Sequence, residues 1–285
     1  MKEEAPCSER RRFLRQAVVS AAAVPLLPLS ARAGTDKETS LQVWSCGGLA
    51  EAFIPANTEY ERQTGIAIAY TGAFAAALGK SLLGSAQTEV FAPRVLDLAR
   101  KLKETGKMVY FKPLCFTQYV VVTPKGNPAG IASITDLGRS GVRVVLAPQA
   151  SPPGGDAVKV ILKKAGVEEA ALKNTVIQGS CVQTIMDDVI DGKGDASIVE
   201  MRLTRVERFA GKVEVISIPS EFLPPPPLPF TIGVMKYAKD RDLADHYVDF
   251  ICSEAGQRFF EQAGFIPAVS EQGKLLVNKL GVHDA

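Results

Sequence analysis

The sequence has few of the residues that most catalytic sites require. It contains only 2 histidines in 285 residues, and neither His246 nor His283 has a visible partner for a Ser/His/Asp or Cys/His pair. The motifs Gly-x-Ser-x-Gly, Gly-x-x-x-x-Gly-Lys-Ser/Thr and Cys-x-x-Cys are absent. The sequence therefore lacks the residues and motifs needed for nucleophilic hydrolysis and for nucleotide hydrolysis. We expect a protein that is not an enzyme.

Long apolar runs are also scarce. The run in residues 17–29 is too short to span a bilayer comfortably, and no later stretch approaches 18 apolar residues. It follows Arg-Arg-x-Phe-Leu-Arg at residues 10–15 and precedes a small-residue Ala-Arg-Ala site at residues 31–33. Residues 1–33 thus resemble a twin-arginine signal peptide, which predicts export and a mature protein that is soluble in the periplasm.

The chain has no basic excess once this leader is set aside. Residues 34–285 carry 27 basic and 28 acidic side chains, so the apparent basicity belongs to the leader. Nucleic acid is a poor candidate partner, because binding phosphate backbones needs a basic face and clustered aromatic groups.

Short apolar runs alternate with helical patterns along the mature chain. Residues 41–45 and 66–72 predict strands, and residues 48–65 and 73–83 predict the helices that follow them. Later units repeat this order, and the chain finishes with a predicted helix over 241–264 and a tail. The pattern indicates α/β architecture with parallel sheets. Four consecutive prolines, Pro224 to Pro227, predict a stiff extended connection.

Several segments in order resemble the periplasmic solute-binding proteins of the molybdate and tungstate family. They are LQVWSCGGLAEAF, EVFAP, YVVVTPKGNPAGI, GDASIVE and YVDFICSEAGQRFFEQAGF, and they cover most of residues 41–267. The resemblance implies the type II periplasmic binding-protein fold. This fold has two doubly wound α/β lobes joined by crossing hinge strands, with a ligand cleft between them. The implied first lobe is 41–114 with 229–285, and the second is 115–228 with the proline-rich crossover.

Such proteins bind ligands at turns after strands, where helix N-termini offer free N–H groups. By this logic the cleft here is lined by residues of several turns. They are Ser45, Cys46, Gly47, Gly48, Thr71, Ala73, Ala92, Gly154, Gly155, Cys181, Val182 and Glu200.

The residues at these turns depart from the family pattern. The family's first-turn serine falls at or near Gly48, with Cys46 two residues earlier, and its late tyrosine is replaced by Glu200. A carboxylate repels a bound dianion unless it is protonated or ligates a metal. The sequence therefore leaves open whether this cleft binds molybdate through hydrogen bonds as the family does, or binds a different ligand.

The mature cysteines allow three interpretations. We expect Cys46, Cys115 and Cys181 to converge on the cleft, and Cys252 to be a small buried helix residue. The cleft thiols could be packed residues, with a possible Cys46–Cys181 disulfide. They could instead bind a soft metal or metalloid together with Glu200, or carry out redox chemistry.

The sequence thus predicts a hinge-closing protein that captures a small inorganic ligand for an ABC importer. The ligand is a molybdate-like oxyanion or a soft ion such as arsenite or copper, and no other cofactor is expected. The alternatives are a periplasmic sensor for a membrane kinase and a thiol-dependent redox or metal accessory protein. In each case we expect a monomer.

Overall fold

Strand and helix boundaries follow local sequence signals. In the computed structural model, which describes residues 40–149, 154–222 and 229–284, the first helix ends at Gly65. Gly65 adopts φ 72°, a left-handed conformation that glycine accepts without a Cβ penalty. Ser133 and Asp136 form a reciprocal capping box at the start of a short helix. The helix end at Gly65 was predicted from the sequence.

The described ranges contain eleven strands. They are β1 (Ser40–Cys46), β2 (Ala67–Ala73), β3 (Val90–Ala92), β4 (Met108–Thr117), β5 (Tyr119–Pro124), β6 (Val144–Leu146), β7 (Thr175–Gln178), β8 (Ser197–Glu200), β9 (Val213–Ser217), β10 (Pro229–Met235) and β11 (Phe265–Pro267).

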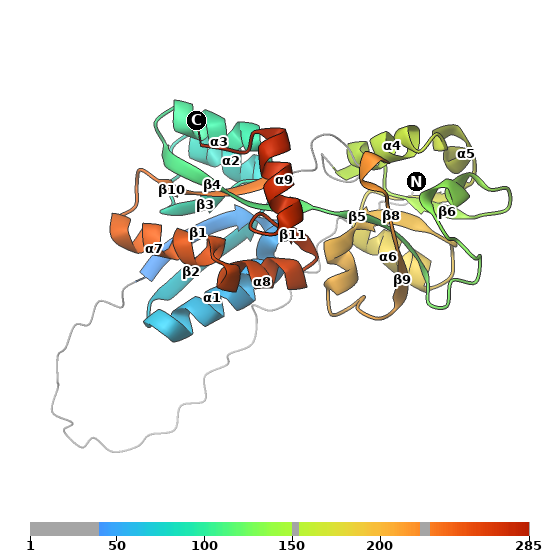
Figure 1. The fold of residues 1–285 in the computed structure, drawn as a ribbon, viewed down its shortest axis with the longest axis horizontal. Helices are drawn as coiled ribbons and strands as arrows, with labels where there is room; N and C mark the ends of the chain where they lie inside the picture. Colours follow the sequence, from blue (N-terminus) through green and yellow to red (C-terminus); the bar gives the residue numbers. More distant parts are fainter. Residues whose placement is uncertain (1–39, 150–153, 223–228, 285) are drawn as a thin grey trace, which may run out of the picture. The chain divides into compact units, whose positions relative to one another are not determined.

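Helices connect most of these strands (Figure 1). The α-helices are α1 (Ala50–Thr64), α2 (Ala75–Leu83), α3 (Leu96–Glu104), α4 (Gly154–Lys164), α5 (Glu168–Lys173), α6 (Val182–Ile190), α7 (Arg241–Cys252), α8 (Glu254–Gln262) and α9 (Glu271–Leu280), and the 3₁₀ helices are η2 (Gly47–Leu49), η3 (Ile134–Gly138), η4 (Met201–Arg205) and η5 (Ser220–Phe222).

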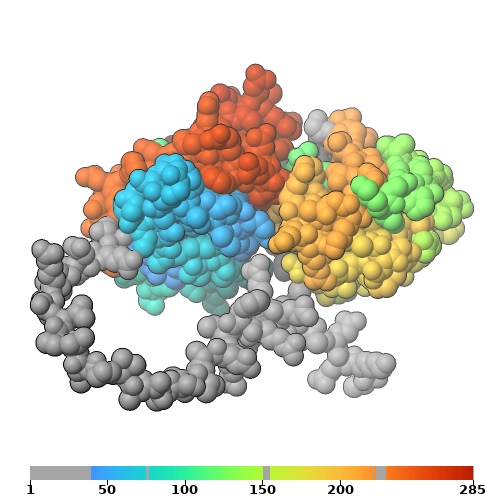
Figure 2. Space-filling view, turned by 90° about the horizontal axis from the view of Figure 1, so that it is seen from below, coloured from blue at the N-terminus to red at the C-terminus, as the bar shows by residue number. Residues whose placement is uncertain are grey.

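A six-stranded sheet with the order β11-β4-β10-β3-β1-β2 carries helices on both faces. One face packs against α1, α7 and α8, and the other against α2, α3 and α9. Helices α1 and α8 lie side by side (Figures 1 and 2), joined by an edge-to-face contact of Phe53 with Phe260 at 5.3 Å. This sheet and its six helices are the first lobe.

The second lobe contains a three-stranded sheet, β8-β5-β9, and the parallel pair β6-β7. Helices α4 and α5 cover one side of its core and α6 covers the other. The α/β fold class is confirmed. The expectation of parallel sheets is only partly right, because β4, β10 and β11 pair antiparallel, as β5 does with β8 and β9.

The C-terminal region differs from the prediction. The predicted single helix is two helices, because Ser253 leaves the helical conformation at ψ 164° and its hydroxyl caps α8 by accepting the Gly256 N–H. The predicted tail contains β11 and α9. Strand β4 was not predicted, since Pro113 interrupts its apolar pattern.

Some predictions fall outside the described residues or stay untested. The signal peptide at 1–33, the prolines Pro224–Pro227 and the turn residues 151–153 lie outside the described ranges. The lobe boundaries stay predictions, because chain contacts group residues 38–285 into one compact unit. Within the ranges described, no helix has the length and apolar character needed to cross a membrane.

Candidate functional site

The first three strands of the first lobe end at one edge of the sheet. They are parallel neighbours, with Cys46 opposite Ala73 and Ser45 opposite Ala92. In an open α/β sheet, ligands bind outside the carboxyl ends of such strands. The structure therefore gathers Cys46, Ala73 and Ala92 at one edge, where the sequence predicted a binding surface.

The second lobe has a corresponding edge. Strands β6 and β7 are parallel, and Val144 of β6 also bridges Ala196 in parallel beside β8. Helix α4 follows β6, α6 begins at Val182 after β7, and Glu200 ends β8. A Cβ atom on Gly155 would lie 2.4 Å from the Pro148 oxygen, so only glycine fits this first turn of α4.

A buried ion cluster joins the two lobes. Arg94, just after β3, donates from Nη2 to Glu200 Oε1 at 2.5 Å. Arg202, in η4, donates from Nε to Glu200 Oε2 at 2.5 Å. The exposed fractions of the three side chains are only 13%, 10% and 15% for Arg94, Glu200 and Arg202. Each carboxylate oxygen of Glu200 thus binds one guanidinium group.

The cluster fixes the charge of Glu200. Burial alone would raise the pKa of its carboxyl group, but Arg94 and Arg202 more than offset that effect and lower the pKa to about 2. Glu200 is therefore ionised at neutral pH. This arrangement gives no support to the predicted role of Glu200 as a metal ligand, since both of its oxygens are engaged by arginine.

Arg94 is held by a strained segment. The next residue, Val95, adopts φ 74°, which is unfavourable for a β-branched side chain, and its N–H donates to the Pro229 oxygen at 3.1 Å. The Arg94 guanidinium also lies 5.7 Å from the centre of the Phe230 ring. Strain of this kind persists where surrounding structure enforces it, and it is frequent at binding sites.

Arg202 contacts the first-lobe turn. A Cβ atom on Gly48 would lie 3.5 Å from Arg202 Cζ, so the glycine turn after β1 faces this guanidinium group. Gly264, at φ 86°, approaches the Arg202 backbone so closely that a Cβ would lie 2.9 Å from its nitrogen. The turn at Cys46–Gly48 and the Arg94–Glu200–Arg202 cluster therefore form one site.

Two buried donors of this site lack hydrogen-bond partners. Within the described ranges, neither Arg94 Nε nor the Tyr119 hydroxyl has one. Tyr119 is 2% exposed and pairs directly with Glu200 across β5 and β8. Because unpaired buried donors are costly, each calls for an explanation.

Other predicted polar residues have different roles. The Ser45 hydroxyl lies 2.6 Å from the Tyr70 hydroxyl and also donates to the Cys46 oxygen. Thr71 is exposed. Neither hydroxyl is placed against the ion cluster by a contact in the described structure.

The described cysteines offer no support for the predicted soft-metal site. Among the residues described, no group of three or more His, Cys, Asp or Glu side chains could hold a metal ion. No disulfide joins Cys46 to Cys181 or to any other described cysteine. The described residues thus give no support to a metal site made by Cys46, Cys115, Cys181 and Glu200, which stays a prediction.

Cys46 borders the site, because Arg94, Arg202 and Glu200 all act on its thiol. Burial raises the pKa of its thiol, although the Gly48 N–H, Arg94 and Arg202 act in the opposite direction. Cys115 is fully buried within β4. Burial is the main cause that raises the pKa of its thiol, and the nearby thiols of Cys252 and Cys46 raise it further. Cys252 is partly exposed and packs against the same core, on the α7 side of the sheet.

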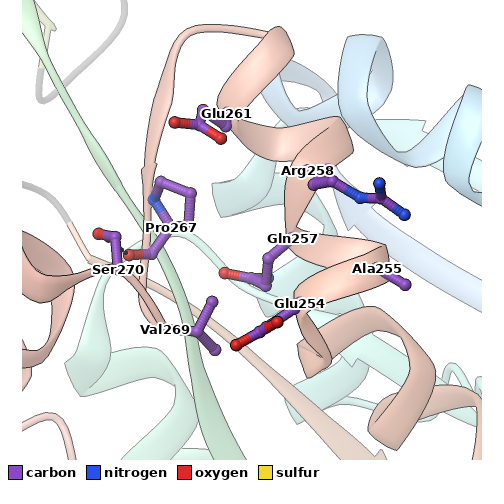
Figure 3. Close-up of a pocket in the computed structure, with 8 residues that line it drawn as sticks. All are labelled: Glu254, Ala255, Gln257, Arg258, Glu261, Pro267, Val269 and Ser270. Carbon is purple, nitrogen blue, oxygen red and sulfur yellow. Dashed lines mark hydrogen bonds between the residues drawn. The ribbon is translucent and has the colours of Figure 1, made fainter.

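A separate hollow of about 600 Å³ lies between α8 and the segment after β11 (Figure 3). Glu254 and Gln257 extend from α8 toward Val269 and Pro267, whereas Arg258 points the other way. Gln257 donates to the Ile251 oxygen and accepts from the Ala268 N–H, both at 3.0 Å. The buried Gln257 amide therefore already forms hydrogen bonds with two backbone groups.

Sequence reasoning missed the two arginines. The sequence pattern placed Ala92 and Glu200 at the edge but did not indicate Arg94 or Arg202. The signal was the position of each arginine, two residues beyond a predicted turn residue. The pairing itself depends on segments 106 residues apart, which no local pattern reveals.

Known proteins are similar to this chain in sequence and in fold. The chain is 27% identical over 248 residues to the molybdate-binding protein ModA of Mycobacterium tuberculosis, covering 84% of this chain and 89% of that protein. A substrate-binding domain from Clostridium difficile, assigned to a molybdenum ABC transporter, superimposes with a TM-score of 0.72 at 20% identity, covering 80% of this chain and 99% of that one. The tungstate-binding protein TupA of Desulfovibrio alaskensis gives 0.61 at 13% identity, covering 80% and 98%.

The structural matches confirm the predicted type II periplasmic binding-protein fold. A family model described as bacterial extracellular solute-binding protein matches residues 41–266, which include Cys46, Arg94, Glu200 and Arg202. The chain belongs to this family of solute-binding proteins.

Proposed function

We propose that the protein captures a small oxyanion of the molybdate and tungstate class outside the cytoplasm and delivers it to the membrane subunits of an ABC importer. It acts by binding and release, not by catalysis. The oxyanion occupies the edge at which the Cys46–Gly48 turn meets Arg94 and Arg202.

The observation that carries this proposal is the buried arginine pair. Arg94 and Arg202 come from different lobes and hold an anionic group between them at 2.5 Å on each side. Guanidinium groups bind oxyanions with charge-assisted hydrogen bonds, which are about twice as strong as neutral ones. A site that stabilises a carboxylate in this way has the charge and donor geometry for another oxyanion.

The relatives support the ligand class. ModA of Mycobacterium tuberculosis is named for molybdate and TupA of Desulfovibrio alaskensis for tungstate. The fold is also shared with the sulfate-binding protein SubI of Mycobacterium tuberculosis, at 18% identity and a TM-score of 0.58. Sulfate therefore belongs in any test of selectivity.

The other interpretations have less support. A thiol-dependent function would need reactive thiolates, whereas burial raises the pKa of Cys46 and Cys115. A sensor-kinase partner is favoured by no feature of the described residues.

The test is calorimetric titration of the purified protein with molybdate, tungstate, sulfate and phosphate, in chloride buffer free of other oxyanions. We expect at least one of the four to bind, and Arg94→Gln to weaken that binding at least tenfold. Arg62→Gln is the matched control, because Arg62 is exposed and pairs only locally with Glu59. Absence of binding by all four anions, or equal binding by Arg94→Gln, would contradict the proposal.

A further inference from the structure

The arginine pair already has an anionic occupant. Glu200 contributes one oxygen to Arg94 and the other to Arg202, each at 2.5 Å. It ends β8 of the second lobe, whereas Arg94 follows β3 of the first lobe. The carboxylate thus takes the position that a captured anion would need.

The charges leave no place for a second anion beside Glu200. The two guanidinium charges face Glu200, and Glu51 also acts on Arg202. Glu51 Oε2 is buried without a hydrogen-bond partner among the residues described. A dianion added to this cluster would meet one engaged carboxylate and a second nearby, and like charges at short range repel strongly in a buried site.

The donors, by contrast, are not all reached by Glu200. Each of its two oxygens accepts from one arginine. Arg94 Nε and the Tyr119 hydroxyl remain buried without partners in the described part of the chain, although a carboxylate has lone pairs to spare. A tetrahedral anion presents oxygens in four directions instead of one plane, so the unreached donors favour a tetrahedral oxyanion over a carboxylate ligand.

We propose that Glu200 is a tethered competitor for the arginine pair, which a tetrahedral oxyanion must displace in order to bind. This inference rests on the proposed function and names a residue that sets its affinity and selectivity. Glu200 occupies the pair in the absence of solute and yields it to an anion with more acceptor oxygens. Weak ligands, including monocarboxylates, cannot displace it.

The experiment measures anion affinity after the competitor is neutralised. Molybdate, tungstate, sulfate and acetate are titrated into the wild type, Glu200→Gln and Glu214→Gln by calorimetry. Glu214 is the matched control, since it lies on β9 in an exposed pair with Lys125 at 3.5 Å. We expect Glu200→Gln to bind the preferred tetrahedral anion at least tenfold more tightly than the wild type, and Glu214→Gln to bind it equally.

A second variant covers the case in which Glu200→Gln does not fold. Glu200→Asp keeps the charge, but its shorter side chain cannot hold both arginines at their present distances. It is expected to bind the same anion about threefold more tightly than the wild type.

The outcomes separate the inference from the proposed function. Binding by the wild type that is unchanged or weakened in both Glu200 variants would overturn the inference and leave the function standing. Binding by a Glu200 variant alone would support competition by Glu200 but contradict capture of the anion by the wild type, and with it the proposed function. If neither the wild type nor the variants bind any tetrahedral anion, both the inference and the proposed function are wrong.

Discussion

At the scale of single residues, an ion pair rather than a thiol distinguishes this site. Cysteine at the first turn suggested soft-ligand chemistry, but Cys46 is 6% exposed and its pKa is raised by burial. Arg94 and Arg202 supply the charge instead. The sequence contains all three residues, yet only the fold shows which of them face each other.

Thiol reactivity follows from the same burial. We expect Cys115, which is fully buried, to react with a thiol reagent at pH 7.5 only when the protein unfolds. Cys46 should react slowly, because its thiol is largely protonated and enclosed, whereas Cys181 is partly exposed and should react first. Time-resolved labelling followed by peptide mass spectrometry gives the order. Rapid labelling of Cys46 in the folded protein would contradict this account.

At the scale of elements, the break between α7 and α8 depends on Ser253. Its hydroxyl accepts the Gly256 N–H at 3.2 Å and donates to the Phe250 oxygen at 2.7 Å. We expect Ser253→Ala to lower the free energy of unfolding by about 1 kcal/mol, the usual cost of a lost N-cap. Urea denaturation measures this change.

Thr58→Ala is the control for that substitution. The Thr58 hydroxyl bonds the Ile54 oxygen on the exposed surface of α1, so the removed bond caps no helix. We expect its free energy of unfolding to stay within about 0.5 kcal/mol of the wild type. Equal losses in the two variants would argue against a special role for Ser253.

Elements were predictable where the signal is local. The left-handed Gly65 and the capping box at Ser133 and Asp136 mark helix ends that any chain context would favour. The single predicted C-terminal helix failed because Ser253 suits both a helix interior and a cap, and tertiary packing decides between them. The antiparallel pairing of β4 with β10 was not predicted, because it joins strands more than 100 residues apart and depends on tertiary packing.

At the scale of the whole molecule, the site couples stability to pH. Arg94, Arg202, Tyr119, Cys46 and Glu51 are the charged or titratable groups that act on this cluster. Only the carboxyl groups titrate in acid, and the folded-state pKa of Glu200, about 2, lies below its ordinary value of 4.5. A depressed pKa stabilises the folded state above pH 4.5, and this contribution is lost as the pH falls toward 2.

Glu200→Gln should therefore change the pH dependence of stability. At pH 7, without added anion, it leaves two buried guanidinium groups unneutralised, and we expect a loss of about 3 kcal/mol. The difference from the wild type should shrink as the pH falls from 5 to 3, measured by denaturant unfolding. A difference that stays constant over this range would show that Glu200 contributes no charge to the folded state.

Whether the arginine pair binds the solute can be seen in a crystal structure of the protein grown with tungstate. Tungsten scatters anomalously, so its position can be located without reference to the protein density. We expect one tungsten peak within hydrogen-bonding reach of Arg94 and Arg202, with the Glu200 carboxylate moved off both guanidinium groups. A peak elsewhere, with Glu200 still bonded to Arg94 and Arg202, would contradict this expectation.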